Sequence, residues 1–433
     1  MQIADTPTPP AEPSQASNRS ALMIVFLVVF IDLLGFGIIL PLLPRIAEGY
    51  VSRILPSATW EIGLIVGLLM SSFSLMQFVF APIWGRLSDR IGRRPILQLG
   101  LLSSAVFYGL FGYAASLPVA EATLALVLFF VARIGAGIAG ATIAAAQAVI
   151  ADSTAPEKRK HGMALIGVAF GIGFTFGPLI GFGCLWISPT NLGLIGYTAA
   201  GLSALAWLLG LALLPETRVF NEDPTGRRHL LDPSAIRQAL GDRAIGPVIL
   251  TFFIASLGFG AFEVTLALFL KDTFNLGENG SFLMFAYVGF VLMLTQGVLY
   301  RRLASRVSEP TFIAMGIFFM LVGVTMQGAI NYTGAVHLAY LFIALTAAVV
   351  GFAFLTPSAH ALISRRTSAD RQGEILGVNQ SASAMARILG PVFGVTLYKA
   401  EDSHVLPYIG GAILLLLLFL MLPKIRRGGD VGA

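Results

Sequence analysis

The stretch Gly85-Arg86-Leu87-Ser88-Asp89-Arg90-Ile91-Gly92-Arg93-Arg94 lies between two segments that are too apolar for water. Charged side chains are costly in hydrocarbon, so this run belongs at a membrane surface. We interpret it as a short turn between two membrane-spanning helices. Its excess of basic residues predicts that the turn lies on the cytoplasmic side.

The composition of the whole chain agrees with a membrane protein. Of the 433 residues, 56% are hydrophobic and 12% are charged, whereas soluble globular proteins carry about 25% charged residues. Each spanning helix needs roughly 20 apolar residues, and twelve such helices would use most of this chain. Cys184 is the single cysteine, which excludes an internal disulfide and a cysteine-based metal cluster.

The apolar segments predict twelve spans in two halves of six. The first half covers 21–214, a cytoplasmic linker covers 215–245, and the second half covers 246–423. The tails 1–20 and 424–433 are expected to be cytoplasmic, and the first is expected to be disordered because Pro, Ser, Ala and Thr dominate it. The expected spans are 21–43, 61–84, 95–115, 122–150, 162–186, 194–214, 246–270, 280–300, 311–331, 336–361, 375–398 and 406–423, with a short surface helix at 233–241.

The basic residues predict the orientation of these spans. With the N-terminus inside, most of the 28 lysines and arginines fall in cytoplasmic segments, whereas the outer loops hold Arg45, Arg53, Lys271 and Lys399. This bias is typical of multi-pass proteins. Both termini are therefore expected to be cytoplasmic, and the short loops favour a bacterial inner (plasma) membrane.

Two matches between the halves indicate an internal repeat. One pairs a Gly-Pro motif in the fifth span with another in the eleventh, and the other pairs the charged turn with its counterpart in the second half. Nearly equal offsets favour a duplicated six-helix unit, although Gly-Pro pairs and basic loops are common in membrane proteins. The matched positions are Gly177, Pro178 and Gly181 with Gly390, Pro391 and Gly394, and Gly85, Leu87, Arg90 and Arg94 with Gly297, Leu299, Arg302 and Arg306.

These features resemble the major facilitator superfamily. Within it they are most similar to the drug:proton antiporters, and especially to the tetracycline-efflux and tetracycline-transporter-like branch. The resemblance implies an all-α fold of two pseudo-symmetric six-helix bundles and proton-coupled efflux of a small amphiphilic or organic-ion solute. The residues that carry it are Gly85, Leu87, Asp89, Arg90, Gly92, Arg93 and Arg94 in the turn, Gly173, Gly177, Pro178 and Gly181 of the antiporter motif, and the runs 32–37 and 133–141.

Some positions depart from the motifs of this branch. Ala164 and Phe182 stand where the antiporter motif has glycine, and Ala136 stands where the fourth-helix motif has glutamine. The spans 95–115 and 311–331 contain no acidic residue, whereas tetracycline antiporters carry acids in both. These departures argue against tetracycline itself as the substrate.

Four ionisable residues fall well inside the expected spans: Asp32, Arg133, Glu263 and Arg387. Such groups are expensive in a membrane and face a partner or a wet cavity. At about 1.5 Å per residue, Asp32 and Arg133 lie near the bilayer midplane. We expect them to meet or to share a substrate and a proton, because their separation would set the proton affinity of the carboxyl group. A fixed structural ion pair is the alternative.

The second half holds the other charged couple. We expect Glu263 and Arg387 to pair. Alternatively, Glu263 binds a proton or a cationic group of the substrate, or it only contacts water in an outer vestibule. The candidate substrate contacts are Gln77, Gln296, Asn379 and Gln380, for each of which bonding to a neighbouring helix is the commoner alternative.

The charged turn and the antiporter motif have expected mechanical roles. The resemblance implies that Asp89 latches against the start of the eleventh helix when the cytoplasmic side is closed. The arginines of the turn would bind Asp89 or anionic lipid; topology alone would explain the arginines but not Asp89. The spacing of Gly173, Gly177 and Gly181 lines one helix face, and Pro178 should bend the helix. That face is either a seam against leak or simple close packing.

The sequence therefore predicts a proton-coupled secondary transporter. It holds no phosphate-binding loop, catalytic triad signature, metal-ligand spacing or nucleic-acid module, so we expect no enzyme activity, cofactor, metal or nucleic-acid partner. The expected partners of the monomer are a small-molecule substrate, protons and membrane lipids. The alternatives are a proton symporter or uniporter on the same fold, and a non-transporting scaffold or receptor.

Overall fold

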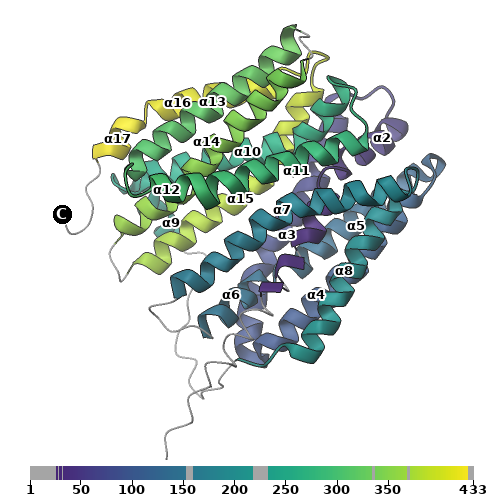
Figure 1. Ribbon diagram of the computed structural model, residues 1–433, viewed down its shortest axis with the longest axis horizontal. Helices are drawn as coiled ribbons and strands as arrows, with labels where there is room; N and C mark the ends of the chain where they lie inside the picture. The colour runs from purple at the N-terminus through teal and green to yellow at the C-terminus, as the bar shows by residue number, and fades with distance from the viewer. Residues whose placement is uncertain are drawn as a thin grey trace, which may run out of the picture.

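The computed structural model describes residues 26–27, 29–31, 33–152, 159–217, 233–333, 337–367 and 371–427. This described part is built from helices and contains no strand. Figure 1 shows two groups of helices side by side, with the N-terminal half in purple to teal and the C-terminal half in green to yellow.

The helices occupy the expected spans, and most extend beyond them by a few residues. The N-terminal half contains the helical segment Val29–Ile39, followed by α2 (Leu43–Ile54), α3 (Trp60–Ile91), α4 (Arg93–Ser116), α5 (Ala122–Gly140), α6 (Ile143–Asp152), α7 (Arg159–Ile187) and α8 (Gly193–Leu213). Helix α9 (Pro233–Gly241) lies where a short surface helix was expected. The C-terminal half contains α10 (Gly246–Asp272), α11 (Glu278–Leu294), the π-helical turn η3 (Thr295–Tyr300), α12 (Arg301–Leu303), α13 (Glu309–Thr333), α14 (Leu338–Arg365), α15 (Gln372–Lys399), α16 (Leu406–Phe419) and α17 (Leu422–Arg427).

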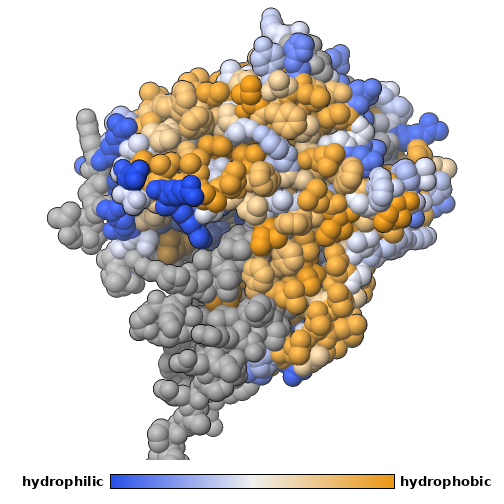
Figure 2. Space-filling model, viewed as in Figure 1, coloured by the Kyte–Doolittle hydropathy of each residue, from blue (hydrophilic) through white to orange (hydrophobic). Residues whose placement is uncertain are grey.

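The apolar surface of these helices agrees with a membrane setting. Eight helices of the described part are long and apolar enough to cross a bilayer, and the bent pair of Val29–Ile39 and α2 makes a ninth. Hydrophobic residues cover most of the coloured surface in Figure 2, and hydrophilic residues gather at its top and sides and in one patch on the left. The all-helical membrane fold is confirmed, whereas the number twelve stays a prediction.

Three spans differ in detail from the expectation. The first bends by 43° and continues as α2 to Ile54, so Arg45 and Arg53 lie on a helix and not in a loop. The fourth breaks between α5 and α6, where the Thr142 hydroxyl donates to the Ala139 carbonyl at 3.0 Å and competes with the helical backbone bonds. The eighth ends in the π-helical turn.

Equivalent helices pack in the same way within each half. In α7, a Cβ atom at Gly177 would lie 2.8 Å from the carbonyl carbon of Gly37 in the first span. In α15, a Cβ atom at Gly394 would lie 2.8 Å from the Cβ of Ala261 in α10. The two Gly-Pro motifs thus place the fifth and eleventh spans against the first and seventh, which supports the internal repeat.

The two halves meet closely at one end and diverge toward the other. The Ser71 hydroxyl of α3 donates to the Ile388 carbonyl of α15 at 2.5 Å, and a Cβ at Gly67 would lie 2.7 Å from the Val392 Cα. Further along these two helices, Leu75 is 40% exposed and Met385 is 39% exposed. We call the diverging end, where α3 meets α4, the basic end. We call the other end, where Glu48 lies, the ion-pair end.

Candidate functional site

Arg133 of α5 is held in an aromatic slot of the N-terminal half. Its guanidinium carbon lies 4.6 Å from the ring centre of Phe73 and 5.7 Å from that of Phe36. One terminal nitrogen donates to the Met70 carbonyl at 3.2 Å, whereas Nε has no hydrogen-bond partner in the described part. The side chain is 4% exposed. The slot therefore fixes a cation inside the protein with part of its bonding capacity unused.

Glu263 of α10 lies within electrostatic range of one arginine from each half. It interacts with Arg387 of α15 and, across the two halves, with Arg133. Among the described residues, no ion pair within 4.0 Å joins Glu263 to either arginine, and Glu263 Oε1 is buried without a hydrogen-bond partner. Glu263 and Arg387 thus attract each other electrostatically, but they do not form a salt bridge in this structure. Arg387 is exposed, although it lies in the middle of α15.

The other expected contact lies outside the described residues. Asp32 is not described, so the predicted meeting of Asp32 and Arg133 stays a prediction. Its chain neighbours Ile31 and Leu33 are buried, at 5% and 7% exposure.

The four candidate polar contacts differ in their surroundings. Asn379 is 1% exposed, and neither atom of its side-chain amide has a hydrogen-bond partner in the described part. Gln77 and Gln296 are half-buried, and Gln380 is exposed. Buried polar groups normally have hydrogen-bond partners. Of these four residues, Asn379 would therefore gain most from a hydrogen bond to an incoming polar group.

The stretch expected to be a turn is mostly helical: α3 continues to Ile91 and α4 begins at Arg93, so only Gly92 lies between them. Asp89 is therefore on the last turn of α3, where it is paired locally. Its carboxylate lies 2.5 Å from an Arg93 terminal nitrogen, and that nitrogen also donates to the Ser88 hydroxyl at 2.7 Å. The Asp89 side chain is 52% exposed, as is consistent with a basic end at which the halves diverge. The expected latch against the start of the eleventh helix belongs to the closed state, and it stays a prediction.

Glu216 fixes the turn from a distant part of the chain. Its carboxylate accepts hydrogen bonds from the backbone amides of Arg93 at 2.9 Å and Arg94 at 3.1 Å, which satisfies the start of α4. Gly92 has φ +108°, and a Cβ there would lie 3.0 Å from the Glu216 carboxyl carbon. Glu216 could not be predicted from the sequence, because nothing in the local pattern links it to residues more than a hundred positions earlier.

The antiporter-motif glycines face two different neighbours. Added Cβ atoms at Gly173 and Gly177 would meet Leu33 and Gly37 of the first span, whereas one at Gly181 would meet Phe282 of α11. The predicted face of small residues thus packs against the first span within the N-terminal half at Gly173 and Gly177, and against α11 of the other half at Gly181. Pro178 lies inside α7 as expected.

A second charged cluster, at the ion-pair end, was also missed. Glu48 of α2 is 7% exposed; it pairs with Lys271 of α10 at 2.6 Å and with Lys399 of α15. Lys399 also lies 3.0 Å from Asp272. Arg45 donates to the Ser281 hydroxyl at 2.5 Å and to the Leu276 carbonyl at 2.8 Å. A signal was present: Arg45, Lys271 and Lys399 are three of the four basic residues expected on the outer side, but the pattern indicated only topology.

Two helical halves with seams of small residues and with ionisable groups between them define a membrane transport protein. The Major Facilitator Superfamily model matches residues 25–391 and, overlapping them, 302–431. The chain belongs to the Major Facilitator Superfamily, and it is a multi-pass membrane transporter and not an enzyme.

Similar proteins come from bacteria and mammals. The chain is 30% identical over 420 residues to the class C tetracycline resistance protein of Escherichia coli, covering 95% of this chain and 98% of that protein. It is 28% identical over 469 residues to mouse major facilitator superfamily domain-containing protein 10, covering 98% and 97%. The crystal structure of the human organic anion transporter MFSD10 (TETRAN) has a TM-score of 0.61 at 25% identity, covering 95% of this chain and 100% of that chain.

Proposed function

We propose that this transporter exports a small organic anion in exchange for protons, by alternating access of a central site to the two ends of the bundle. The observation that carries the proposal is that Glu263 is buried within electrostatic range of Arg387 of its own half and of Arg133 of the other half. Ionisable groups inside a membrane protein are rare, and they mark substrate or proton pathways.

The proton couples to the movement of the halves through charge. Arginine stays protonated in proteins, and Arg133 is held by Phe36 and Phe73. Glu263 is therefore the member of this group whose charge changes. When the Glu263 carboxyl group takes up a proton, its attraction to Arg133 in the other half is lost. Conformations in which Glu263 and Arg133 are far apart then become more favourable. Asp32, on the first span, is the second acid proposed for this role.

The arginines favour a solute with an acidic group. In the described part of the site, two guanidinium groups lie within electrostatic range of one carboxylate, and Arg387 is exposed. A carboxylate on the solute would find a planar donor in Arg387, and Asn379 offers unused hydrogen-bonding capacity. The human relative that is named as an organic anion transporter supports the same class, and the tetracycline resistance relatives support a small amphiphilic solute.

The test is transport by purified protein in liposomes under an imposed pH gradient. Carboxyfluorescein serves as the anionic probe and ethidium as the cationic probe, with protein-free liposomes as the control. The proposal predicts movement of carboxyfluorescein against the proton flow. Movement in the same direction as protons would indicate a symporter, and movement that ignores the gradient would indicate a uniporter. Absence of any flux would favour a non-transporting scaffold.

We propose the inner (plasma) membrane as the location, with both termini cytoplasmic, on the evidence of the basic residues.

A further inference from the structure

A groove on the C-terminal half lies over α14, between α11 and α13. Figure 1 shows α14 between these two helices. The groove has a volume of about 350 Å³ and shares no residue with the site described above. Pockets of about this size, from roughly 300 Å³ upward, hold small ligands and are mostly apolar. The described residues that line it are uncharged, and they include Tyr287, Phe319, Phe342, Thr346, Ala347 and Val350.

The two hydroxyl groups in the wall of this groove are bonded to each other. The Thr346 hydroxyl donates to the Phe342 carbonyl of its own helix at 2.6 Å, and it lies 2.6 Å from the Tyr287 hydroxyl. Because the carbonyl takes the single proton of Thr346, Tyr287 is the donor between the two hydroxyl groups. Both donors are therefore satisfied without a ligand, and the wall suits a hydrocarbon chain better than a polar solute.

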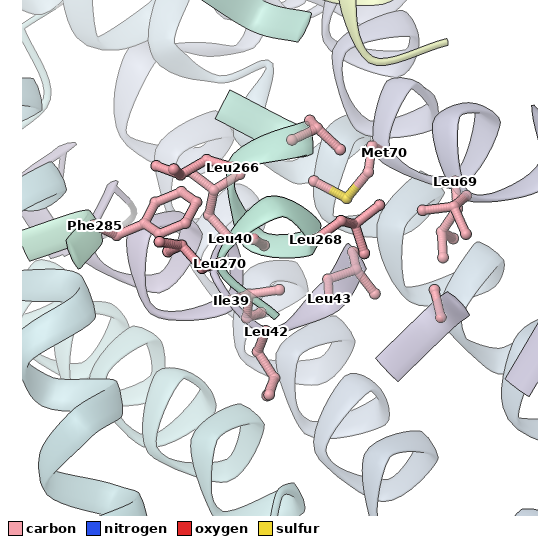
Figure 3. Close-up of a cluster of buried hydrophobic side chains, with 14 of the residues drawn as sticks. Ile39, Leu40, Leu42, Leu43, Leu69, Met70, Leu266, Leu268, Leu270 and Phe285 are labelled. Atoms are coloured by element: carbon pink, nitrogen blue, oxygen red, sulfur yellow. The ribbon is translucent and has the colours of Figure 1, made fainter. Parts of the chain in front are cut away.

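The packed core closes the inner side of the groove. Tyr287, Phe342 and Val350 pack against the buried hydrophobic cluster that contains Leu270 and Phe285. Figure 3 labels these two residues among the side chains gathered there, and Phe285 is 3% exposed. An occupant of the groove therefore enters from the outer surface of the bundle.

The open side of the groove belongs to the apolar surface of the protein. Ile343, which also lines the groove, is 55% exposed, and Phe318 of α13, next to Phe319, is 52% exposed. Exposed apolar side chains on helices that are apolar all round face the hydrocarbon of a bilayer. The molecules that meet this opening are thus membrane lipids.

The length and the level of the groove match one leaflet of a bilayer. Tyr340, Ile343, Ala347 and Val350 lie on one face of α14, because three or four residues separate each from the next. From Tyr340 to Val350 this face runs about 15 Å, which is half of a hydrocarbon core of about 30 Å. Tyr340 is 50% exposed in the first turn of α14, and exposed tyrosines are typical of the headgroup level. The groove therefore extends from the headgroups to about the middle of the bilayer.

We propose that this groove binds one acyl chain of a phospholipid from the leaflet at the ion-pair end, with the lipid headgroup at the level of Tyr340. The apolar wall, the depth of one leaflet and the opening toward hydrocarbon all favour this occupant. Each methylene group that leaves the disordered lipid for the groove gains contacts with aromatic and aliphatic side chains. The proposal concerns a lipid and not the transported solute, so it holds or fails independently of the proposed function.

The experiment counts lipids that stay bound to the purified chain in detergent. The protein is titrated with palmitoyl-oleoyl phosphatidylcholine, and bound lipid is measured by native mass spectrometry. This lipid carries no net charge, so the arginines of the basic end do not attract it. Ala347→Phe fills the groove with a ring, and Val350→Phe fills its deep end. Ala329→Phe is the matched control, because Ala329 is exposed on α13 and does not line the groove.

The proposal predicts one lipid that binds more tightly than the rest. Ala347→Phe and Val350→Phe should raise the Kd for this lipid about tenfold or more, because loss of about two buried methylene groups already has an effect of that size. Ala329→Phe should leave the Kd within about twofold of the parent value.

An unchanged Kd in folded Ala347→Phe protein, or an equal rise in Ala329→Phe, would overturn the proposal. A dimer of the chain that dissociates in Ala347→Phe would overturn it as well, because the groove would then hold a second copy. If Ala347→Phe does not give a monodisperse protein, Val350→Phe decides. The measurement needs neither a transported solute nor a pH gradient, so a failure of proton coupling would not be mistaken for a failure of lipid binding.

Discussion

The guanidinium carbon of Arg133 lies 4.6 Å from the ring centre of Phe73, one helix away. A cation over an aromatic face contributes about 0.5–2 kcal/mol, and more when both groups are away from water. Phe73→Leu keeps an apolar side chain and removes the ring. We expect it to lower the melting temperature in detergent by more than Phe80→Leu does, further along α3, and to weaken transport. Equal shifts for the two variants would show that the aromatic face contributes nothing.

Gly92→Ala tests the turn between α3 and α4. Gly92 has φ +108°, and a Cβ there would approach the Glu216 carboxyl group that caps α4. We expect a loss of at least about 1 kcal/mol in the free energy of unfolding, because an L-residue is strained in this conformation. The control is Gly201→Ala, where a Cβ meets nothing within 4 Å. Thermal unfolding of both variants gives the comparison, and a neutral Gly92→Ala would mean that the turn relaxes freely.

Substitution of two glycines of α7 by alanine tests whether close helix packing, and not the change to alanine as such, determines stability. A Cβ at Gly177 would lie 2.8 Å from the Gly37 carbonyl carbon, whereas one at Gly183 meets nothing within 4 Å. Backbone atoms on both sides cannot yield as a side chain would, so Gly177→Ala should cost about 1–3 kcal/mol. Gly183→Ala should be neutral or slightly stabilising, because alanine favours the helix. Yield and melting temperature after purification check this, and similar behaviour of the two variants would refute the seam.

Asp89→Asn tests whether Asp89 holds the basic end closed during transport or whether the charged stretch only sets the orientation of the protein in the membrane. The Asp89 side chain is 52% exposed and that of Arg93 is 7% exposed. A pair that is open to water on one side contributes on the order of 1 kcal/mol or less, so the melting temperature should change little. If Asp89 latches the closed basic end, the initial rate of transport in liposomes should fall at least tenfold. Glu309→Gln is the control, because Glu309 accepts a hydrogen bond from Arg365 at 2.9 Å in a pair that is also confined to one half. A normal rate in Asp89→Asn would leave topology as the role of the turn.

Most of the fold could be predicted because the membrane constrains it strongly. Long apolar segments in lipid have to form helices, and the charged turn at 85–94 marked where α3 ends and α4 begins. The bend after Ile39 could not be predicted, and neither could the helical continuation through Arg45 to Ile54. Charges near the end of an apolar run look like a loop when their partners, here Ser281 and Leu276, lie in the other half of the chain.

The site could be predicted only in part. Arg133, Glu263 and Arg387 stood out because ionisable groups are rare inside apolar helices. Their neighbours did not stand out: Phe73 is one of 32 phenylalanines, and its role depends on how α3 crosses α5. Glu48 and Glu216 were missed for a related reason, since each acts on residues far away in sequence. A contact between residues that are far apart in the chain leaves no pattern in the local sequence, whereas a lipid-embedded helix leaves a long apolar segment.

The central claim is that protonation of a carboxyl group between the halves drives export. The most direct measurement compares carboxyfluorescein transport by the parent protein and by Glu263→Gln in liposomes, with and without an imposed pH gradient. The account predicts that the variant folds, that gradient-driven transport falls at least tenfold, and that exchange without a gradient persists. Gradient-driven transport at the parent rate in folded Glu263→Gln protein would contradict it.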